Sequence, residues 1–148
     1  GPSPPPSAPP YAYPIAGAIV MVGALMAALI IGGASSPAAA ASLASVSDAT
    51  FASYLTTHAP TIIDVRTPEE FAAGHLPGAI NIDFHHDNFR EKLAALDRRQ
   101  EYAVYCRSGN RSGDTLALMR ELGFSEVRDL SGGIKGWLAA GRDACTDC

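Results

Sequence analysis

Cys106 stands near the head of a segment whose residue types are those that activate a thiol, YCRSGNRSG over residues 105–113. Two arginines and a glycine follow the cysteine within five residues, after an apolar run that ends at Tyr105. Positive charge and backbone N–H groups both stabilise a thiolate, which is the nucleophilic form of cysteine. The pattern therefore predicts a reactive cysteine. The alternative is a structural cysteine buried at the end of a strand.

The loop after Cys106 predicts an anion-binding cradle. Gly109 and Asn110 tolerate the positive φ that a sharp turn needs, so successive N–H groups can point inward as a nest. A helix expected from about Ser112 adds unpaired N–H donors and the positive end of its dipole. We assign Cys106 as catalytic and the six residues after it as substrate-binding: Arg107, Ser108, Gly109, Asn110, Arg111 and Ser112.

Strands and helices alternate along residues 46–148, and this order predicts an α/β domain with a mostly parallel sheet. Strands are expected at residues 61–65, 79–82, 102–105 and 127–130, and helices at residues 48–55, 68–73, 89–96, 112–122 and around Trp137. Ser47 or Asp48 can cap the first helix, and Thr67 and Glu70 have the spacing of a capping box. Ligands bind beyond the carboxyl ends of parallel strands, and Cys106 lies at such an end.

The charged residues divide the chain in two, because all 11 basic and 15 acidic residues lie between Asp48 and Asp147. Residues 1–14 form a Pro-rich tail, which favours extended polyproline II structure. Residues 15–34 (Ile15 to Ala34) carry no polar side chain and would make a helix about 30 Å long, the thickness of a bilayer's hydrocarbon core. We expect a single transmembrane helix there, a linker at residues 35–45 and a domain at residues 46–148.

Two other interpretations of the apolar stretch stay open: a secretory signal peptide and a buried core helix. Gly23 and Ala27 form a small-xxx-small pair that would let another helix approach closely, so we expect a membrane protein partner. No Lys or Arg flanks the stretch, and its orientation in the membrane is therefore left open. The net charge of −4 and the lack of a Lys/Arg cluster argue against binding to nucleic acid.

Four segments resemble the single-domain rhodaneses in their order and spacing. They are IDVRTPEEF at residues 63–71, GHLPGAINI at 74–82, VYCRSGNRS at 104–112 and LSGGIKGW at 130–137. The resemblance covers residues 46–140 and implies a three-layer α/β fold. It also implies a sulfurtransferase without a cofactor, which moves sulfane sulfur from thiosulfate or a persulfide donor to a thiol acceptor through a persulfide on Cys106.

Two other functions are weighed against this one. The cell-cycle phosphatases resemble rhodaneses but have one more residue between the cysteine and the arginine. Here four residues separate Cys106 from Arg111, and the shorter loop favours sulfur over the larger phosphate. The second alternative is a structural or accessory subunit of a membrane complex that uses a rhodanese-like module for assembly. The intact loop favours the enzyme.

The resemblance gives Asp64 and Arg66 structural roles. Asp64 is expected to bond to loop backbone, and Arg66 to pair with a nearby carboxylate such as Glu70. His75 is expected to pack and hydrogen bond rather than to act as a base, since persulfide formation needs a thiolate that is already present.

The remaining metal-ligand residue types predict no metal site. His85 and His86 are adjacent, and an exposed loop explains them better than a metal site does. Cys145 and Cys148 form a Cys-x-x-Cys pair, but no second pair completes a zinc site. A disulfide, a redox couple and free thiols that accept sulfane sulfur from Cys106 all stay open for this pair.

Overall fold

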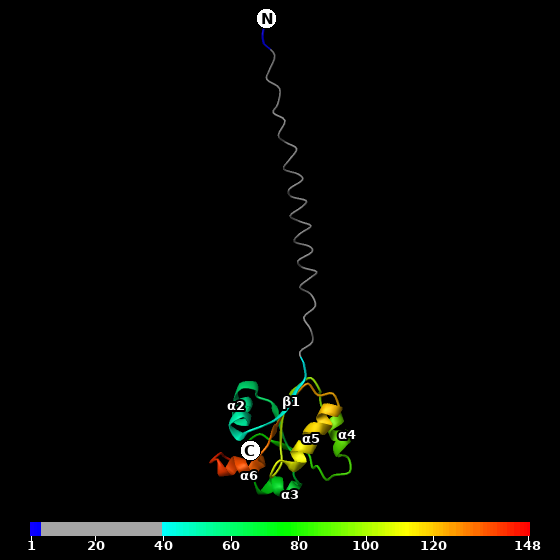
Figure 1. The fold of residues 1–148 in the computed structure, drawn as a ribbon, viewed down its shortest axis with the longest axis vertical. Helices are drawn as coiled ribbons and strands as arrows, with labels where there is room; N and C mark the ends of the chain where they lie inside the picture. The colour runs from blue at the N-terminus through cyan, green and yellow to red at the C-terminus, as the bar shows by residue number, and fades with distance from the viewer. Residues whose placement is uncertain (4–39) are drawn as a thin grey trace. The chain divides into compact units, whose positions relative to one another are not determined.

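The computed structural model describes residues 1–3 and 40–148 (Figure 1). One compact unit runs from Ala40 to Cys148. Most of the predicted Pro-rich tail, the predicted transmembrane helix at residues 15–34 and the first part of the predicted linker lie outside the described residues. Within the part of the chain that is described, no helix has the length and apolarity to cross a bilayer.

The domain is built on a five-stranded sheet in the order β1-β5-β4-β2-β3, with every pairing parallel. The strands are β1 (Ser42–Val46), β2 (Thr61–Asp64), β3 (Ile80–Asn81), β4 (Glu101–Tyr105) and β5 (Glu126–Leu130). The helices are α2 (Asp48–His58), α3 (Pro68–Ala73), α4 (Phe89–Ala94), α5 (Asn110–Glu121) and α6 (Gly133–Ala139). The predicted α/β class and parallel sheet are confirmed.

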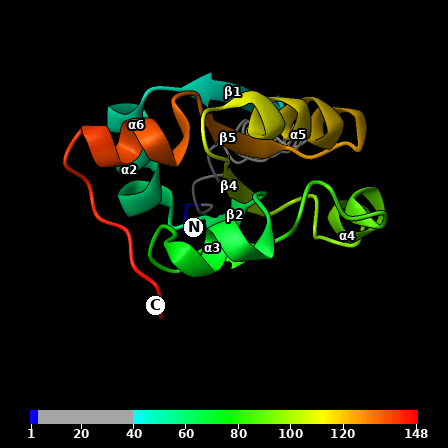
Figure 2. The same cartoon turned by 90° about the horizontal axis from the view of Figure 1, so that it is seen from below.

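Helices cover both faces of the sheet and give two separate cores. Figure 2 shows α2 and α6 on one side of the strands and α4 and α5 on the other. Strand β4 feeds both cores, because successive side chains of a strand point to opposite faces. Tyr102 and Val104 pack in the core under α4 and α5, while Ala103 and Tyr105 pack in the core under α2 and α6. The expected three-layer arrangement is therefore present.

The first strand corrects the predicted linker at residues 35–45. Ser42–Val46 is β1, an edge strand that pairs in parallel with β5 from Ser42 opposite Glu126 to Val46 opposite Leu130. Its sequence, SLASV, has weak strand propensity and no clear alternation. The pairing with β5 supplies the backbone hydrogen bonds that the local sequence does not predict, so the domain begins before residue 46.

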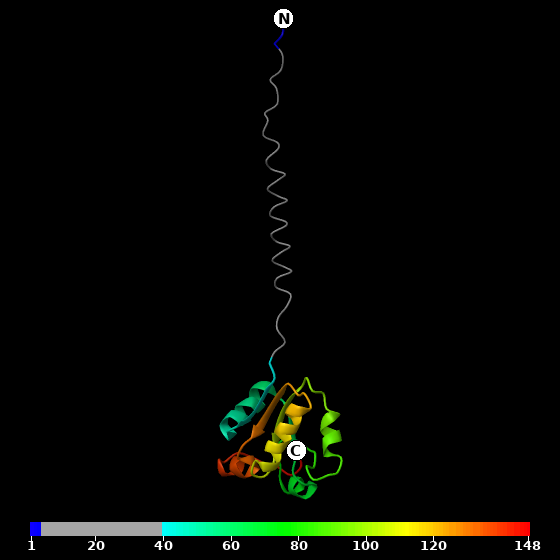
Figure 3. The ribbon, with the colours of Figure 1, turned by 45° about the vertical axis from the view of Figure 1, so that its right-hand side comes forward.

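Two helix starts follow the predicted capping. The Ser47 hydroxyl accepts a hydrogen bond from the Thr50 N–H at the start of α2. At α3, Thr67 and Glu70 form both halves of a capping box, with Pro68 at the first position. The first turn of α5 (yellow), α3 (green) and α6 (orange-red) gather at the same end of the sheet, as Figure 3 shows. This end is where the loop after β4 lies.

Candidate active site

Cys106 directly follows the central strand β4 and is 1% exposed. Its Sγ accepts a hydrogen bond from the Gly109 N–H at 3.1 Å and one from the Ser112 hydroxyl at 3.4 Å. Helix α5 begins at Asn110, two residues before the predicted start, and Gly109 is its N-cap. The thiol therefore faces the first turn of α5, where backbone N–H groups have no partner within the helix.

The loop turns at Gly109, which has φ +103°. Asn110 was also expected to allow a positive φ, but it is already helical, and Gly109 alone makes the turn. A Cβ at Gly109 would overlap the carbonyl oxygen of Ser131. Only glycine therefore fits at this position, because the backbone has a positive φ and because the Ser131 carbonyl leaves no space for a Cβ.

Helix α6 sets the direction of the loop's peptide groups. The Ile134 N–H donates to the Cys106 carbonyl at 2.9 Å, and the Lys135 N–H donates to the Arg107 carbonyl at 3.0 Å. In a trans peptide the C=O and the following N–H point in opposite directions. With these two carbonyls directed at α6, the N–H groups of Arg107 and Ser108 point away from α6, and the Ser108 N–H is one of the donors to the thiol.

The electrostatics of the cradle favour the thiolate. Burial alone would raise the pKa of the Cys106 thiol. Hydrogen bonds from the Ser112 hydroxyl and from the backbone N–H groups of Ser112, Gly109 and Ser108 outweigh burial and bring that pKa below its usual value. These donors are fixed by α5 and by the turn, so they need no rearrangement when the charge forms.

Removing the Ser112 hydroxyl tests this account of the thiol pKa. In Ser112→Ala we expect the pH midpoint for alkylation of Cys106 by iodoacetamide to move upward, because one donor to the thiolate is lost while burial remains. Ser108→Ala, which keeps its backbone donor, is the matched control and should leave the midpoint in place. An unchanged midpoint in a folded Ser112→Ala protein would show that the hydroxyl does not stabilise the thiolate.

The two loop arginines differ in their surroundings. Arg111 forms two parallel bonds with Glu70 on α3, from Nη1 to Oε1 at 2.8 Å and from Nη2 to Oε2 at 3.1 Å. This ion pair, helped by hydrogen bonds from Thr67, lowers the pKa of Glu70 to about 2. Arg107 is exposed, and none of the ion pairs between described residues includes it. Of the two predicted anion-binding side chains, Arg107 is the one with a free guanidinium.

The Arg111–Glu70 pair gives a pH-dependent contribution to stability. The pKa of Glu70 is about 2 in the folded protein, against the 4.5 that is usual for a glutamate side chain. A carboxyl group whose pKa is lower in the folded protein stabilises the fold at pH values above its pKa in the unfolded chain. That stabilisation disappears as the pH falls through the pKa of the group in the folded protein. At pH 7 we expect Glu70→Gln to cost about 0.5–1 kcal/mol, because the pair is partly exposed and screened.

Thermal unfolding of Glu70→Gln and wild type at several pH values checks this expectation. The difference between the two proteins should be full near pH 7 and shrink as the pH falls from about 4.5 towards 2. Glu69→Gln is the control, since Glu69 is exposed in the same first turn and makes no such pair. A difference that stays constant over this pH range would contradict the assignment.

Arg66 corrects another expectation. It does not pair with Glu70. Its guanidinium binds the fully buried Asp64, from Nη2 to Oδ2 at 2.6 Å, and donates to the Gly74 carbonyl at 2.6 Å. Asp64 also accepts the Arg66 backbone N–H at 2.9 Å, which agrees with its expected bond to loop backbone. Burial of Asp64 explains the choice, because an unpaired carboxylate there would cost far more than one at the half-exposed Glu70.

The histidines behave largely as expected. His75 is 3% exposed, stacks on Phe71 with ring centroids 3.8 Å apart, and has a ring nitrogen 2.9 Å from the Phe71 carbonyl. His85 and His86 are exposed in the turns between β3 and α4.

Cys145 and Cys148 form a disulfide, one of the forms left open for this pair.

Asp129 is a buried acid beside the site that the sequence does not reveal. It lies on β5, is 1% exposed, and accepts a hydrogen bond from Ser45 on β1. Burial raises the pKa of Asp129, and the hydrogen bond from Ser45 opposes the rise. Its other carboxylate oxygen, Oδ1, has no hydrogen-bond partner among the described residues. Because β1 was not predicted, its partner Ser45 could not be predicted either.

Taken together, the fold and the site define a class: a parallel α/β domain that holds a buried cysteine in a cradle of N–H groups at the carboxyl edge of its sheet. The rhodanese-like domain family matches residues 47–140. The chain belongs to this family, and the resemblance in the four sequence segments is confirmed.

Characterised relatives and solved structures agree with this assignment. A sulfurtransferase of Allochromatium vinosum is 34% identical over 80 residues, which cover 54% of this chain and 73% of that protein. The thiosulfate sulfurtransferase PspE of Escherichia coli is 37% identical over 49% of this chain and 69% of that protein. A crystal structure of a rhodanese-related protein from Thermoplasma volcanium matches with a TM-score of 0.62 and 32% identity, covering 70% of this chain and 98% of the other. The chain is a rhodanese-type sulfurtransferase.

Proposed function

We propose that the chain moves sulfane sulfur from thiosulfate or a persulfide donor to a thiol acceptor, through a persulfide on Cys106. One observation carries the proposal: the Cys106 Sγ is buried, yet it receives the Gly109 N–H and the Ser112 hydroxyl, and its pKa lies below the usual value. A buried structural cysteine has no need of these donors, whereas a nucleophilic thiolate does.

In the first step the Cys106 thiolate attacks the outer sulfur of thiosulfate. A bond forms between Sγ and that sulfur, the sulfur–sulfur bond of thiosulfate breaks, and sulfite leaves with the electron pair. The outer sulfur of the resulting persulfide carries a negative charge. N–H groups in the first turn of α5 stabilise this charge, because they point to the place where it develops.

In the second step an acceptor thiolate attacks the outer sulfur of the persulfide. The acceptor becomes a persulfide, and the Cys106 thiolate is restored with the electron pair of the broken bond. Sulfur is transferred as a neutral atom, so neither step needs an external oxidant or reductant. The same cradle serves the free thiolate, the persulfide and the thiolate that is formed again.

The two arginines of the loop, Arg107 and Arg111, have different electrostatic roles in this proposal. Arg107 is exposed and attracts the anionic donor to the mouth of the site. Arg111 is neutralised by Glu70 and holds α3 against the Cys106 loop. Four residues between Cys106 and Arg111 make a cradle suited to one sulfur atom rather than to a phosphoryl group.

Steady-state kinetics on the full chain test the proposed function. With thiosulfate and a small thiol varied together, we expect a ping-pong pattern with release of sulfite, because a covalent intermediate separates the two substrates. An aryl phosphate should not be hydrolysed. Folded protein that produces no sulfite, or that hydrolyses the phosphate ester faster than it transfers sulfur, would overturn the proposal.

We further propose that residues 15–34 anchor this activity to a membrane. The length and complete apolarity of the stretch support the proposal. Expression of the full chain and of a variant lacking residues 15–34 tests it. The full chain should stay with membranes after alkaline carbonate extraction and the variant should not, whereas equal solubility of both would contradict the anchor. The role of an accessory subunit gains no support from the site, whose thiol and donors are intact.

A further inference from the structure

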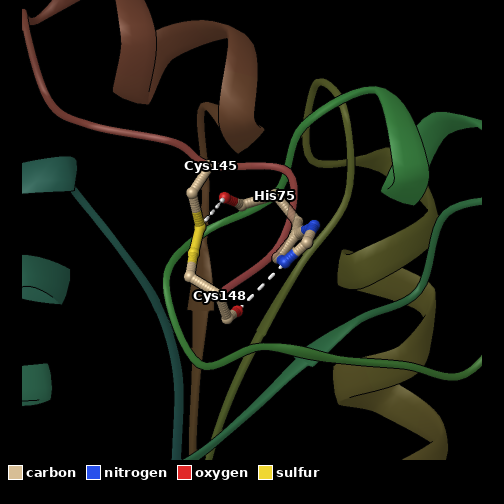
Figure 4. A group of neighbouring side chains, drawn as sticks. All are labelled: His75, Cys145 and Cys148. Atoms are coloured by element: carbon tan, nitrogen blue, oxygen red, sulfur yellow. Dashed lines mark hydrogen bonds between the residues drawn. A yellow bond between two sulfur atoms is a disulfide. The ribbon is translucent and has the colours of Figure 1, made fainter.

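His75, Cys145 and Cys148 form a cluster of metal-ligand side chains that the proposed sulfur transfer does not use (Figure 4). A ring nitrogen of His75 and the two sulfur atoms all lie within 4.8 Å of one another. His75 is separated from Cys145 by 70 positions in the sequence. For this reason the Cys-x-x-Cys pair looks like half of a zinc site when the sequence is considered alone.

The backbone holds the cysteines at His75 without help from the disulfide. His75 and Cys145 exchange two hydrogen bonds, from the His75 N–H to the Cys145 carbonyl at 2.8 Å and from the Cys145 N–H to the His75 carbonyl at 2.9 Å. The Gly78 N–H adds a bond to the Cys148 carbonyl at 3.3 Å. Reduction of the disulfide would therefore leave two thiols beside the imidazole.

Both ring nitrogens of the His75 imidazole face backbone carbonyl oxygens. Its Nδ1 lies 2.9 Å from the Phe71 carbonyl, and its Nε2 lies 3.2 Å from the Cys148 carbonyl. A neutral imidazole has one N–H, so it can donate to only one of these two oxygens. If Nδ1 donates to Phe71, the lone pair of Nε2 faces an oxygen. A cation between Nε2 and that oxygen resolves the conflict.

We propose that the dithiol form of the chain binds one zinc ion through His75 Nε2, Cys145 Sγ and Cys148 Sγ. In a tetrahedral site, typical zinc bond lengths put ligand atoms about 3.3–3.8 Å apart. Once the disulfide is reduced, the two sulfur atoms must move apart to reach this spacing, and they start from positions that both lie within 4.8 Å of the ring nitrogen of His75. The Cys148 carbonyl, 3.2 Å from Nε2, lies where a fourth oxygen ligand belongs. The hydrogen bond from Nδ1 to Phe71 orients the ring, as outer-sphere partners do in zinc sites.

The disulfide and the zinc site are alternative states of the same residues. A dithiol reductant supplies two electrons and two protons to give two thiols and is itself oxidised to a disulfide. Zinc binding then displaces both thiol protons, because thiolates are the ligands. Two thiolates and an imidazole select zinc over calcium or magnesium, which prefer oxygen ligands.

Zinc titration of the full chain tests the proposal. The protein carries Cys106→Ser, so that the active-site thiol cannot bind metal and failure of sulfur transfer cannot affect the result. It is reduced with a phosphine, freed of reductant and titrated with zinc against a chromophoric chelator. We expect one equivalent to bind to the reduced form and none to the disulfide form. Cobalt in place of zinc should give thiolate-to-metal charge-transfer absorption.

Two variants locate the ligands. The double variant Cys145→Ser, Cys148→Ser should lose binding altogether. His75→Gln, which keeps an amide to donate to Phe71, should weaken it by at least about 10-fold. The proposal is overturned if the reduced form binds no zinc, or if binding survives the double variant. An unchanged affinity in His75→Gln with a native circular dichroism spectrum overturns it as well. Should His75→Gln unfold, the nitrogen NMR signals of the His75 imidazole in the parent still decide, because the Nε2 signal moves on zinc addition only if Nε2 binds the metal, and an unmoved signal would overturn the proposal.

Discussion

Cys106→Ser is expected to lower the turnover of thiosulfate with a thiol acceptor by at least about 10³-fold, because it replaces the proposed nucleophile. Serine has nearly the shape of cysteine and can accept the same hydrogen bonds from Gly109 and Ser112. Its hydroxyl, however, loses a proton far less readily than a thiol whose pKa is already below its usual value. The fold should therefore survive while the reaction stops, and sulfite release in the presence of a thiol measures the loss.

The control for this variant is the Cys145→Ser, Cys148→Ser double variant. Both cysteines lie outside the cradle and are joined in a disulfide, so the proposed mechanism gives them no step. The double variant should keep most of the turnover. Turnover that falls in the double variant and persists in Cys106→Ser would mean that another thiol carries the sulfur.

Gly133→Ala is expected to damage both the stability and the activity of the domain. Gly133 has φ +62°, and a Cβ there would overlap the carbonyl group of Arg107 and the nitrogen of Ser108. The backbone conformation alone costs an alanine about 1–2 kcal/mol. The overlap also pushes the peptide groups whose N–H atoms face the thiol. We expect a loss of at least about 2 kcal/mol in the free energy of unfolding and a fall in turnover of at least about 10-fold.

Gly136→Ala provides the matched comparison within α6. A Cβ at Gly136 meets no atom within 4 Å, and alanine favours a helix interior by about 1 kcal/mol over glycine. This variant should be as stable as wild type or more stable, with turnover unchanged. Chemical denaturation and the sulfite assay on both variants give the result. Equal behaviour of the two would show that the approach of α6 to the Cys106 loop does not shape the cradle.

Most of the helices and strands that the sequence predicts correctly are indicated by residues within or next to the element itself. Residues 102–105 of β4 are an apolar run, and the capping residues Thr67 and Glu70 act within one turn, so both features can be predicted from neighbours in the sequence. The edge strand β1 could not be predicted in the same way. Its residues Ser42–Val46 resemble a linker, and only the pairing with β5, more than 80 positions later, makes them a strand.

The contacts of the site also divide into those that the local sequence predicts and those that it does not. Cys106, Gly109 and Ser112 lie within seven residues, so their meeting around one sulfur could be predicted from the loop. Which arginine pairs with which carboxylate could not be predicted from the sequence. Arg66 and Arg111 compete for Asp64 and Glu70, and the outcome depends on how deeply each carboxylate is buried once the sheet and α3 have formed. Sequence shows which charges exist, but burial decides which of them pair.

Intact-mass measurement shows directly whether Cys106 carries a persulfide. The full chain, with Cys145 and Cys148 kept as the disulfide, is incubated with thiosulfate, freed of excess donor and weighed beside Cys106→Ser. We expect the parent to gain the mass of one sulfur atom and to lose it again on addition of a thiol, while the variant gains nothing. A folded parent that gains no sulfur, or a variant that gains as much as the parent, would contradict a Cys106 persulfide.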